Sequence, residues 1–250
     1  SGSDHPVSVS IQDTTTGWEV QTNKEGIPVL RTSGSLSAGI SYSSGKQQTI
    51  TLHTPPATQL PGTWKVSFVP KSDQPFEMEF PELIDFSEHS NNEIRYFSGT
   101  ATYLKKIMMN EDQLKSGHRI LLDLGAMNDI AEIRVNGQPV AVLWYPPYRT
   151  DITEALEAGE NELEIAVTNN WANRLIGDEQ EPADLEWGDE RGNQGHGLKA
   201  YPDWFINNQP RPSQGRKTFT IWHYYREDSP LQPAGLVGPV RLQYQSEKQL

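Results

Sequence analysis

The sequence contains no cysteine, which excludes disulfides, thiolate zinc sites and cysteine nucleophiles. It also lacks an apolar run of about 18 residues, so no membrane-spanning helix is predicted. Basic residues are scarce, because 21 Lys and Arg stand against 33 Asp and Glu, which gives a formal charge of −12. A chain this acidic is not expected to bind nucleic acid or an anionic membrane. The six histidines are scattered without an i, i+4 pair, so no histidine-based metal site is predicted.

The dominant pattern is the alternation of apolar and polar residues with a period of two, which is typical of strands with one buried face. Turn signals separate the segments, and Asn136-Gly137 is the pair that a tight hairpin turn requires. The pattern predicts an all-β protein built as an antiparallel jelly-roll sandwich. The alternating segments are 64–68, 76–80, 120–124, 133–135, 163–167 and 218–221.

Helix signals are few. Asp151 can cap a short helix, Glu154 lies three residues further on, and Gly159 can end it. The sequence therefore predicts one or two helical turns as a connector between strands.

The sequence predicts a division near Leu60, because the alternating strand patterns before it are weaker than those after it and because the stretch around it is rich in proline. Residues 1–59 form a short β-rich N-terminal segment, expected to be the tail of a preceding β-domain, and 60–250 form the jelly roll. The stretch 54–62 contains three prolines and is predicted to be a linker or strand-entry loop. The opening Ser-Gly-Ser is expected to be a processed or recombinant end without a signal peptide. Weaker strands are expected around 7–12, 17–22, 27–32, 36–43 and 46–53.

A long loop without a regular period, 171–216, interrupts the jelly roll and holds three of the seven tryptophans. Loops of this length in a compact domain are usually functional or disordered, and the tryptophans argue against disorder. Exposed aromatic rings can stack on the C–H faces of sugars while amides, carboxylates and arginine bind hydroxyls. Alternatively, the rings form a small satellite core. The candidate carbohydrate-binding residues are Trp171, Asn173, Arg174, Asp178, Trp187 and Trp204.

Acidic residues crowd the same loop and allow three interpretations. They form a solvated loop, a carboxylate pair that hydrolyses glycosides, or a structural calcium site. The solvated loop is favoured, since no EF-hand pattern is present and sequence spacing does not give the carboxylate separation. No catalytic residue is assigned. The residues are Asp178, Glu179, Glu181, Asp184, Glu186, Asp189 and Glu190.

Two further features have a structural and a functional interpretation. Arg174 can brace the loop through Asp178, four residues away, or reach a substrate hydroxyl. The aromatic and proline-rich stretch 144–149 is a rigid strand exit or a sugar-facing rim. The structural interpretation is favoured for both.

Three stretches resemble a known family. The stretches 118–153 and 159–169 (GENELEIAVTN) are similar to the galactose-binding-like jelly roll that accompanies glycoside hydrolase family 2. The stretch 171–178 (WANRLIGD) resembles the C-terminal region of glycoside hydrolase family 106, the α-L-rhamnosidase-like enzymes. The likeness covers roughly residues 60–245, and it implies that Trp171, Asn173, Arg174 and Asp178 lie in a sugar-contacting region.

The resemblance implies a non-catalytic accessory module of a bacterial glycoside hydrolase acting on rhamnose-containing glycans. Its expected partners are a glycan and the catalytic domain, which in such enzymes is a separate barrel, and its expected location is periplasmic or extracellular. Structural calcium is a further implication. The alternatives are a structural β-sandwich without sugar contact, an independent carbohydrate-binding module, and a glycosidase that uses the acidic loop. The sequence does not identify the glycan, the linkage or the oligomeric state.

Overall fold

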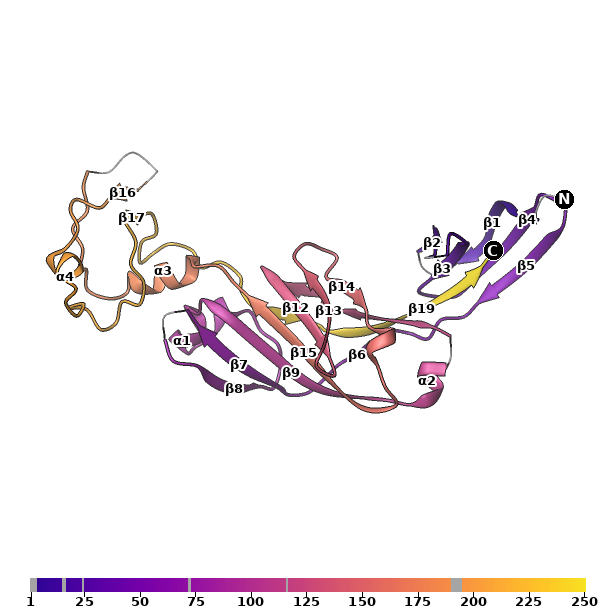
Figure 1. Ribbon diagram of the computed structural model, residues 1–250, viewed down its shortest axis with the longest axis horizontal. Coiled ribbons are helices and arrows are strands. Elements are labelled where there is room, and N and C mark those ends of the chain that lie inside the picture. Colours follow the sequence, from indigo (N-terminus) through magenta and orange to yellow (C-terminus); the bar gives the residue numbers. More distant parts are fainter. Residues whose placement is uncertain (1–3, 15–16, 24, 72, 116, 190–194) are drawn as a thin grey trace.

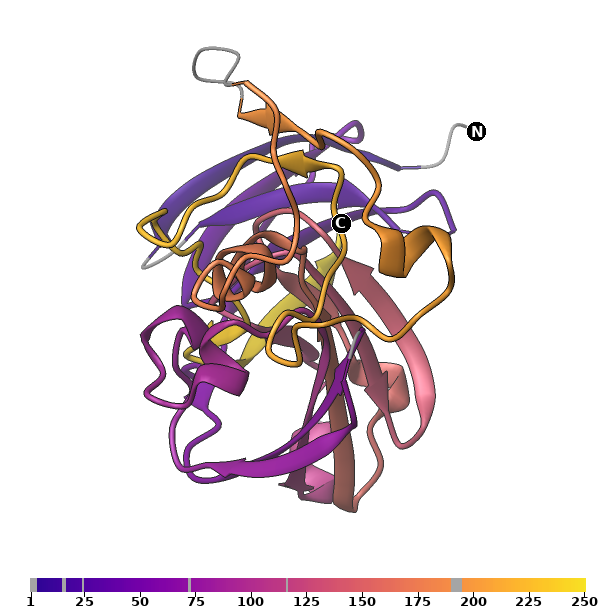
Figure 2. The ribbon, with the colours of Figure 1, turned by 90° about the vertical axis from the view of Figure 1, so that its left-hand side faces the viewer.

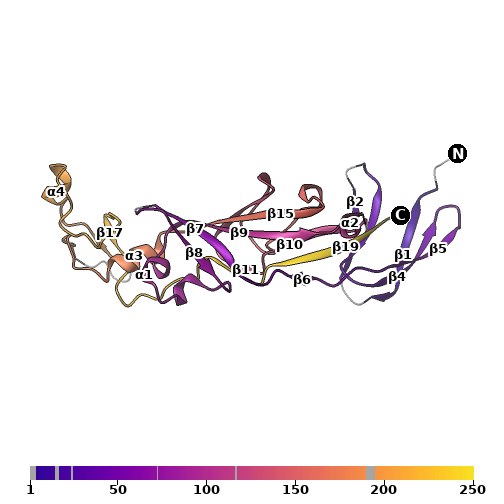
Figure 3. The ribbon, with the colours of Figure 1, turned by 90° about the horizontal axis from the view of Figure 1, so that it is seen from below.

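The protein is elongated, with three parts following one another along its long axis (Figure 1). The computed structural model describes residues 4–14, 17–23, 25–71, 73–115, 117–189 and 195–250. A β-sandwich occupies the middle. Residues 171–233, called the excursion below, project from one end, and the first strands lie at the opposite end together with both termini (Figures 1 and 3).

The described elements are mostly strands. Their bounds are β1 Pro6–Thr14, β2 Trp18–Thr22, β3 Pro28–Thr32, β4 Leu36–Tyr42, β5 Gln47–Leu52, β6 Thr58–Gln59, β7 Trp64–Pro70, β8 Phe76–Phe80, η1 Phe86–Glu88, α1 Asn92–Arg95, β9 Gly99–Met109, α2 Glu111–Lys115, β10 Arg119–Asp123, β11 Ala126–Met127, β12 Ile130–Val135, β13 Gln138–Leu143, β14 Arg149–Asp151, η2 Thr153–Ala155, β15 Gly159–Thr168, α3 Ala172–Asp178, β16 His196–Gly197, α4 Asp203–Ile206, β17 Trp222–His223, β18 Leu236–Gly238 and β19 Arg241–Gln249.

Two layers form the sandwich, as predicted. One is an antiparallel sheet in the order β13-β12-β15-β9-β7-β8. The facing layer contains β14, β10 and the first half of β19, with β6 on its edge and the short pair β11-β18 nearby. The protein is an all-β sandwich, and the period-two pattern predicted this fold class from the sequence.

The inward side of each strand fills the sandwich. Trp64, Val66 and Phe68 of β7 are fully buried, whereas Lys65 and Val69 between and beside them are exposed. Phe68 lies at the centre of an aromatic cluster and stacks on Phe76 with ring centroids 4.7 Å apart. Such close packing of large apolar groups is the main source of stability in a domain of this kind.

The last strand connects the sandwich to the first strands. Residues 241–245 of β19 pair with β10, and residues 246–249 pair with β3. A separate small core lies there, beside the sheet β1-β4-β5, and it is formed by Leu30, Leu36, Ala38, Ile40 and Ile50. The weak strands expected in residues 1–53 are all present, while the division near residue 60 stays a prediction.

Local predictions had mixed outcomes. The hairpin turn at Asn136-Gly137 is confirmed, with φ angles of 52° and 75°. The helix after Asp151 is a single 3-10 turn, and the Asp151 carboxylate accepts a hydrogen bond from the Thr153 backbone N–H at 3.0 Å. The strand predicted over 218–221 is wrong, because that segment is irregular. Helix α3 was not predicted. None of the described helices has the length and apolar character that a bilayer crossing needs.

Candidate functional site

Helix α3 anchors the excursion where it leaves the sandwich. Ala172 and Ile176 are buried on its inner side, while Trp171, just before it, is 44% exposed. The buried Asn173 side chain donates to the Gln232 carbonyl at 2.7 Å and accepts from the Gln232 N–H at 2.8 Å. These two hydrogen bonds join the outgoing and returning chain, so Asn173 closes the neck of the excursion.

Asp178 is a buried carboxylate with a complete set of partners. It accepts hydrogen bonds from the backbone N–H groups of Lys217 at 3.0 Å and Thr218 at 2.7 Å, and from the Thr218 hydroxyl at 2.5 Å. Arg174 Nε donates to the same carboxylate at 3.1 Å. A buried charge is tolerated only when it is paired in this way. Arg174 and Asp178 therefore brace the excursion, which is the structural interpretation of that pair.

Other acidic residues of the excursion are also bound to cations. Arg216 pairs with Glu179 at 2.8 Å and donates to the Pro182 and Glu181 carbonyls at 2.9 Å each. Glu179 also lies 2.9 Å from the His223 imidazole. Arg211 forms two hydrogen bonds to Asp184, whose side chain is 5% exposed, at 2.5 and 3.0 Å.

Glu186 and Lys199 form an exposed ion pair at 3.1 Å. Among the described residues, no group of three or more His, Asp or Glu could hold a metal ion. Glu190 lies outside the described residues. The acidic loop is thus largely a set of ion pairs that hold the excursion together, and calcium stays a prediction.

The two later candidate tryptophans serve packing in the excursion. Trp187 stacks on His223 with ring centroids 4.9 Å apart. Trp204 meets Phe219 edge to face at 5.8 Å, and the Arg211 guanidinium lies 5.6 Å from its ring centroid. This packing agrees with the satellite-core interpretation. Exposed apolar side chains nevertheless remain on the excursion, namely Trp171, Tyr201, Phe205, Ile206, Ile221, Trp222 and Tyr224.

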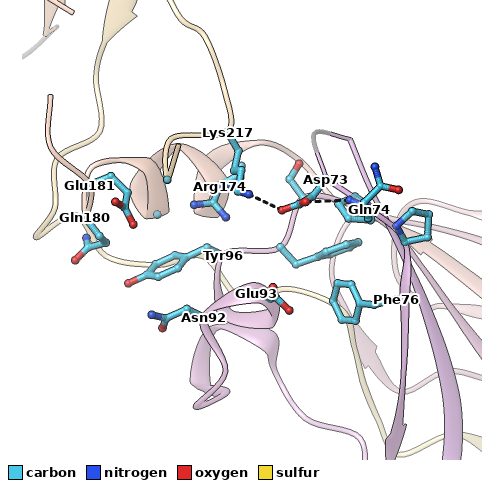
Figure 4. A pocket seen from close by; sticks show the side chains of 16 residues that line it. Asp73, Gln74, Phe76, Asn92, Glu93, Tyr96, Arg174, Gln180, Glu181 and Lys217 are labelled. Carbon is cyan, nitrogen blue, oxygen red and sulfur yellow. Dashed lines mark hydrogen bonds and ion pairs between the residues drawn. The ribbon is translucent and has the colours of Figure 1, made fainter. Parts of the chain in front are cut away.

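A cavity of about 420 Å³ lies at the base of the excursion, between α3 and the end of the sandwich (Figure 4). Its walls come from three distant parts of the chain: the β7–β8 connection, α1 with the residues after it, and the excursion. Phe97 and Ser98 are buried parts of its lining, and Tyr96 points into its centre between the helices. The labelled side chains around it are Asp73, Gln74, Phe76, Asn92, Glu93, Tyr96, Arg174, Gln180, Glu181 and Lys217.

Close approach and an ion pair fix the geometry of this cavity. A Cβ on Gly177 would lie 2.5 Å from Tyr96 Cγ, so glycine lets α3 pack directly on that ring. Lys217 of the excursion bonds Asp73 of the β7–β8 connection at 2.8 Å. The hydrogen bond from Lys217, followed by that from the Gln74 N–H, holds the pKa of Asp73 below its ordinary value. The excursion is therefore tied to the sandwich across the cavity.

Comparison with known proteins places this architecture in a family. The family described as "Glycosyl hydrolase 2 galactose-binding domain-like" matches residues 83–210, about half of the chain. The chain belongs to this family. The match includes β9 to β15, α3 and α4, so it extends into the excursion as far as residue 210.

Larger proteins contain similar chains. A curated protein of Formosa agariphila, named "Putative beta-glucuronidase", is 42% identical over 208 residues, which are 83% of this chain and 17% of that protein. A rhamnosidase structure from Novosphingobium sp. PP1Y is similar over 96% of this chain and 25% of its own, with 23% identity and a TM-score of 0.58. This second likeness supports the fold alone.

A β-glucuronidase structure from Ruminococcus gnavus is similar over 45% of this chain and 21% of its own, with 17% identity and a TM-score of 0.39, too low to inform the fold. The chain thus spans about a sixth of the curated relative and a quarter of the rhamnosidase chain.

The cavity is the part of the site that sequence reasoning missed. Arg174 was a candidate and lines it, and Glu181, which also lines it, was considered only as part of the acidic loop, whereas Asp73, Tyr96 and Ser98 were not assigned to any site. Trp187 and Trp204 do not line it. The motif Tyr-Phe-Ser-Gly-Thr at 96–100 is the one local signal, because it leaves a hydroxyl beside an aromatic pair at a strand start.

Proposed function

We propose that this galactose-binding-like domain is a non-catalytic accessory module of a larger glycoside hydrolase of the family 106, α-L-rhamnosidase-like kind, near its C-terminus. In this role it packs against the catalytic domain and contributes sugar contacts for rhamnose-containing glycans. The parent enzyme would be a bacterial protein acting in the periplasm or outside the cell.

One observation carries the proposal: the excursion is braced by internal ion pairs and yet exposes aromatic rings. Tyr201, Phe205 and Tyr224 are 52%, 48% and 60% exposed on a segment that projects from the sandwich (Figures 1 and 2). Exposed rings that gather on one braced element are typical of a surface that meets a ligand or another domain.

The carboxylates favour binding over cleavage. Glycoside hydrolysis needs two carboxyl groups about 5.5 or 6.5–9.5 Å apart, one acting as acid and the other as nucleophile or base. Asp178, Glu179 and Asp184 are bonded to arginines of the excursion, which keeps them in structural roles. The residues that remain for sugar contact are the exposed aromatic rings and the groups lining the cavity.

A second candidate is an accessory module of an enzyme that acts on glucuronate-containing glycans. The name of the Formosa agariphila relative, at 42% identity, favours it. The two candidates share the accessory role and differ in the sugar.

Titration calorimetry of the chain with rhamnose-containing and glucuronate-containing oligosaccharides, with and without calcium, tests this function. Each mixture is also assayed for released sugar. We expect saturable binding of the rhamnose-containing set without release. Trp171→Ala should weaken binding, and Trp144→Ala, which truncates an exposed ring of the sandwich, is the matched control.

Absence of any binding would instead support a purely structural module. Release of free sugar would move the chemistry onto the carboxylates of this chain. Binding of the glucuronate set alone would favour the second candidate.

A further inference from the structure

The end of the protein opposite the excursion is a two-layered body with a small core. It consists of the described residues of 4–53 and the end of β19, residues 246–249, and is called the N-terminal body below (Figures 1 and 3). The sheet β1-β4-β5 forms one layer, and β2, β3 and the end of β19 form the other. Five buried apolar side chains make up its core. A core of this size rarely holds a body together without further contacts.

Strand β2 has apolar side chains on the core side of its layer, but they are not fully covered. In the register of the two strands, Trp18 pairs with Thr32 and Val20 pairs with Leu30. Directly paired residues of neighbouring strands point to the same face of a sheet, and Leu30 belongs to the small core. Trp18 and Val20 therefore lie on the core side, yet each is 44% exposed.

The two layers leave open edges on the same side of the N-terminal body. The chain just after β5 bonds to β19, because the Ser246 hydroxyl donates to the His53 carbonyl at 3.0 Å and accepts from the Thr54 hydroxyl at 2.7 Å. The β5 side of one layer thus lies by the β19 side of the other. The opposite outer strands are β1 and β2. Three residues separate Thr14 of β1 from Trp18 of β2, which keeps these two strands close together.

The open edge of β1 is suited to a further strand. β1 runs over nine residues and pairs with β4 alone among the described strands. It contains no lysine, its proline is its first residue, and its one charge is Asp13 near its end. Edge strands that stay free usually carry lysine, proline or inward charges that block pairing. The stretch Ser8–Ile11 is regular, between two irregularities of register, and lacks all of these.

We propose that an extended segment of a neighbouring β-domain in the parent enzyme adds to the N-terminal body beside Ser8–Ile11. Its backbone pairs with the open edge of β1, and its apolar side chains cover Trp18 and Val20 of β2. This inference takes up the prediction that residues 1–59 are the tail of a preceding β-domain. It goes beyond the proposed function, because it concerns an interface at the other end of the protein from the excursion.

Three observations favour this occupant. The chain spans 17% of the Formosa agariphila relative and 25% of the rhamnosidase chain, so both contain much further polypeptide. The likeness to the rhamnosidase covers 96% of this chain and therefore takes in the N-terminal body. A row of backbone N–H and C=O groups selects an extended strand as its partner. A second copy is disfavoured, since two chains with a formal charge of −12 repel each other.

The test compares amide hydrogen exchange at residues 8–11 in this chain alone and in the full-length parent enzyme. The amides that point away from β4 should exchange at least about tenfold more slowly in the parent enzyme, because the added strand bonds them. Val20→Ser removes an apolar contact of that strand and should return the exchange toward the rate of the chain alone. Val69→Ser, which changes a 50% exposed strand valine of the sandwich, is the matched control and should stay within about twofold.

Exchange of β9, measured in the same samples, should be the same in all variants and thereby shows that the sandwich is folded. Equal rates at residues 8–11 in the chain alone and in the parent enzyme would overturn the proposal. Slow exchange in the chain alone that depends on protein concentration would assign the edge to a second copy instead. Protection that survives Val20→Ser in the parent enzyme would contradict the covering of β2. None of these outcomes bears on glycan binding, so the proposed function is tested separately.

Discussion

The sandwich and the excursion are stabilised by different forces within one chain. The sandwich buries a continuous set of apolar side chains between two strand layers, with Phe68 at an aromatic centre. The excursion has two short helices and one short strand pair among its described residues, and ion pairs such as Asp178 with Arg174 and Asp184 with Arg211 hold it together. Apolar packing is insensitive to pH, whereas a network of buried charges fails when a single partner is lost.

This difference explains how the excursion, at one end of the protein, can present a surface for binding while the sandwich serves as its scaffold. A sandwich core fixes the scaffold, and a segment braced by its own charges can expose rings to a ligand without giving up its shape. The cavity lies between the sandwich and the excursion. Lys217 of the excursion and Asp73 of the β7–β8 connection form an ion pair that joins these two parts.

The largest expected effect is in the sandwich. Phe68→Ala removes a ring that is 0% exposed and should lower the free energy of unfolding by about 3–5 kcal/mol in a urea titration. Val69→Ala, one residue along the same strand and 50% exposed, should change it by less than about 0.5 kcal/mol. Equal effects would mean that β7 does not pack as described.

The next effect should be confined to the excursion. Asp178→Ala leaves Arg174 and two backbone N–H groups without their acceptor and should cost about 3 kcal/mol of local stability. Amide exchange of Lys217 and Thr218 should accelerate while the unfolding midpoint of the sandwich barely moves. A global loss of equal size would show that the two regions form one cooperative unit.

Acid should act on the sandwich through Asp151. Burial raises the pKa of this carboxyl, but hydrogen bonds from Thr153 and the Arg119 pair outweigh burial, so its pKa lies below the ordinary aspartate value. Because the folded state holds the proton less tightly than the unfolded state, Asp151 stabilises the fold above about pH 4, and this contribution is lost in stronger acid. Asp151→Asn should flatten the dependence of the unfolding free energy on pH below about pH 4.

The pKa of Asp129 is shifted in the opposite direction to that of Asp151, so the two variants should change the acid dependence of stability in opposite ways. Burial raises the pKa of Asp129, with hydrogen bonds from Asn170 only partly offsetting it. The folded state therefore takes up that proton first, and Asp129→Asn should steepen the loss of stability in acid. Identical slopes for both variants would contradict this account.

The smallest effect should come from an exposed pair of the excursion. Glu186 and Lys199 have side chains 79% and 65% exposed, so Glu186→Gln should change stability by less than about 0.5 kcal/mol. It should also leave glycan binding unchanged, as calorimetry of the variant would show. A loss of stability as large as that expected for Asp178→Ala would mean that the exposure of an ion pair does not determine how much it stabilises the excursion.

Sequence patterns predicted the sandwich because its signal is local. Alternation along β7 or β15 is visible within seven to ten residues, and the Asn136-Gly137 turn lies within one hairpin. The excursion depends on contacts between residues far apart, such as Asp178 with Thr218, 40 positions apart. The segment 218–221 alternates as a strand would, yet Thr218 pairs with a carboxylate instead of a neighbouring strand.

The candidate site was predictable only in part for the same reason. The stretch around Arg174 and Asp178 was recognised from its residues, although both side chains brace the excursion. The cavity needs residues near positions 73, 96, 177 and 215 to meet, and no local pattern reports such a meeting.

The most direct test of the central claim, that this domain contacts sugar without cutting it, is amide NMR mapping of the labelled chain with a rhamnose-containing oligosaccharide. The account predicts shifts confined to the cavity lining and the exposed rings of the excursion, with no free sugar formed. Shifts confined to the sandwich faces or to residues 144–148, or the appearance of free sugar, would contradict it.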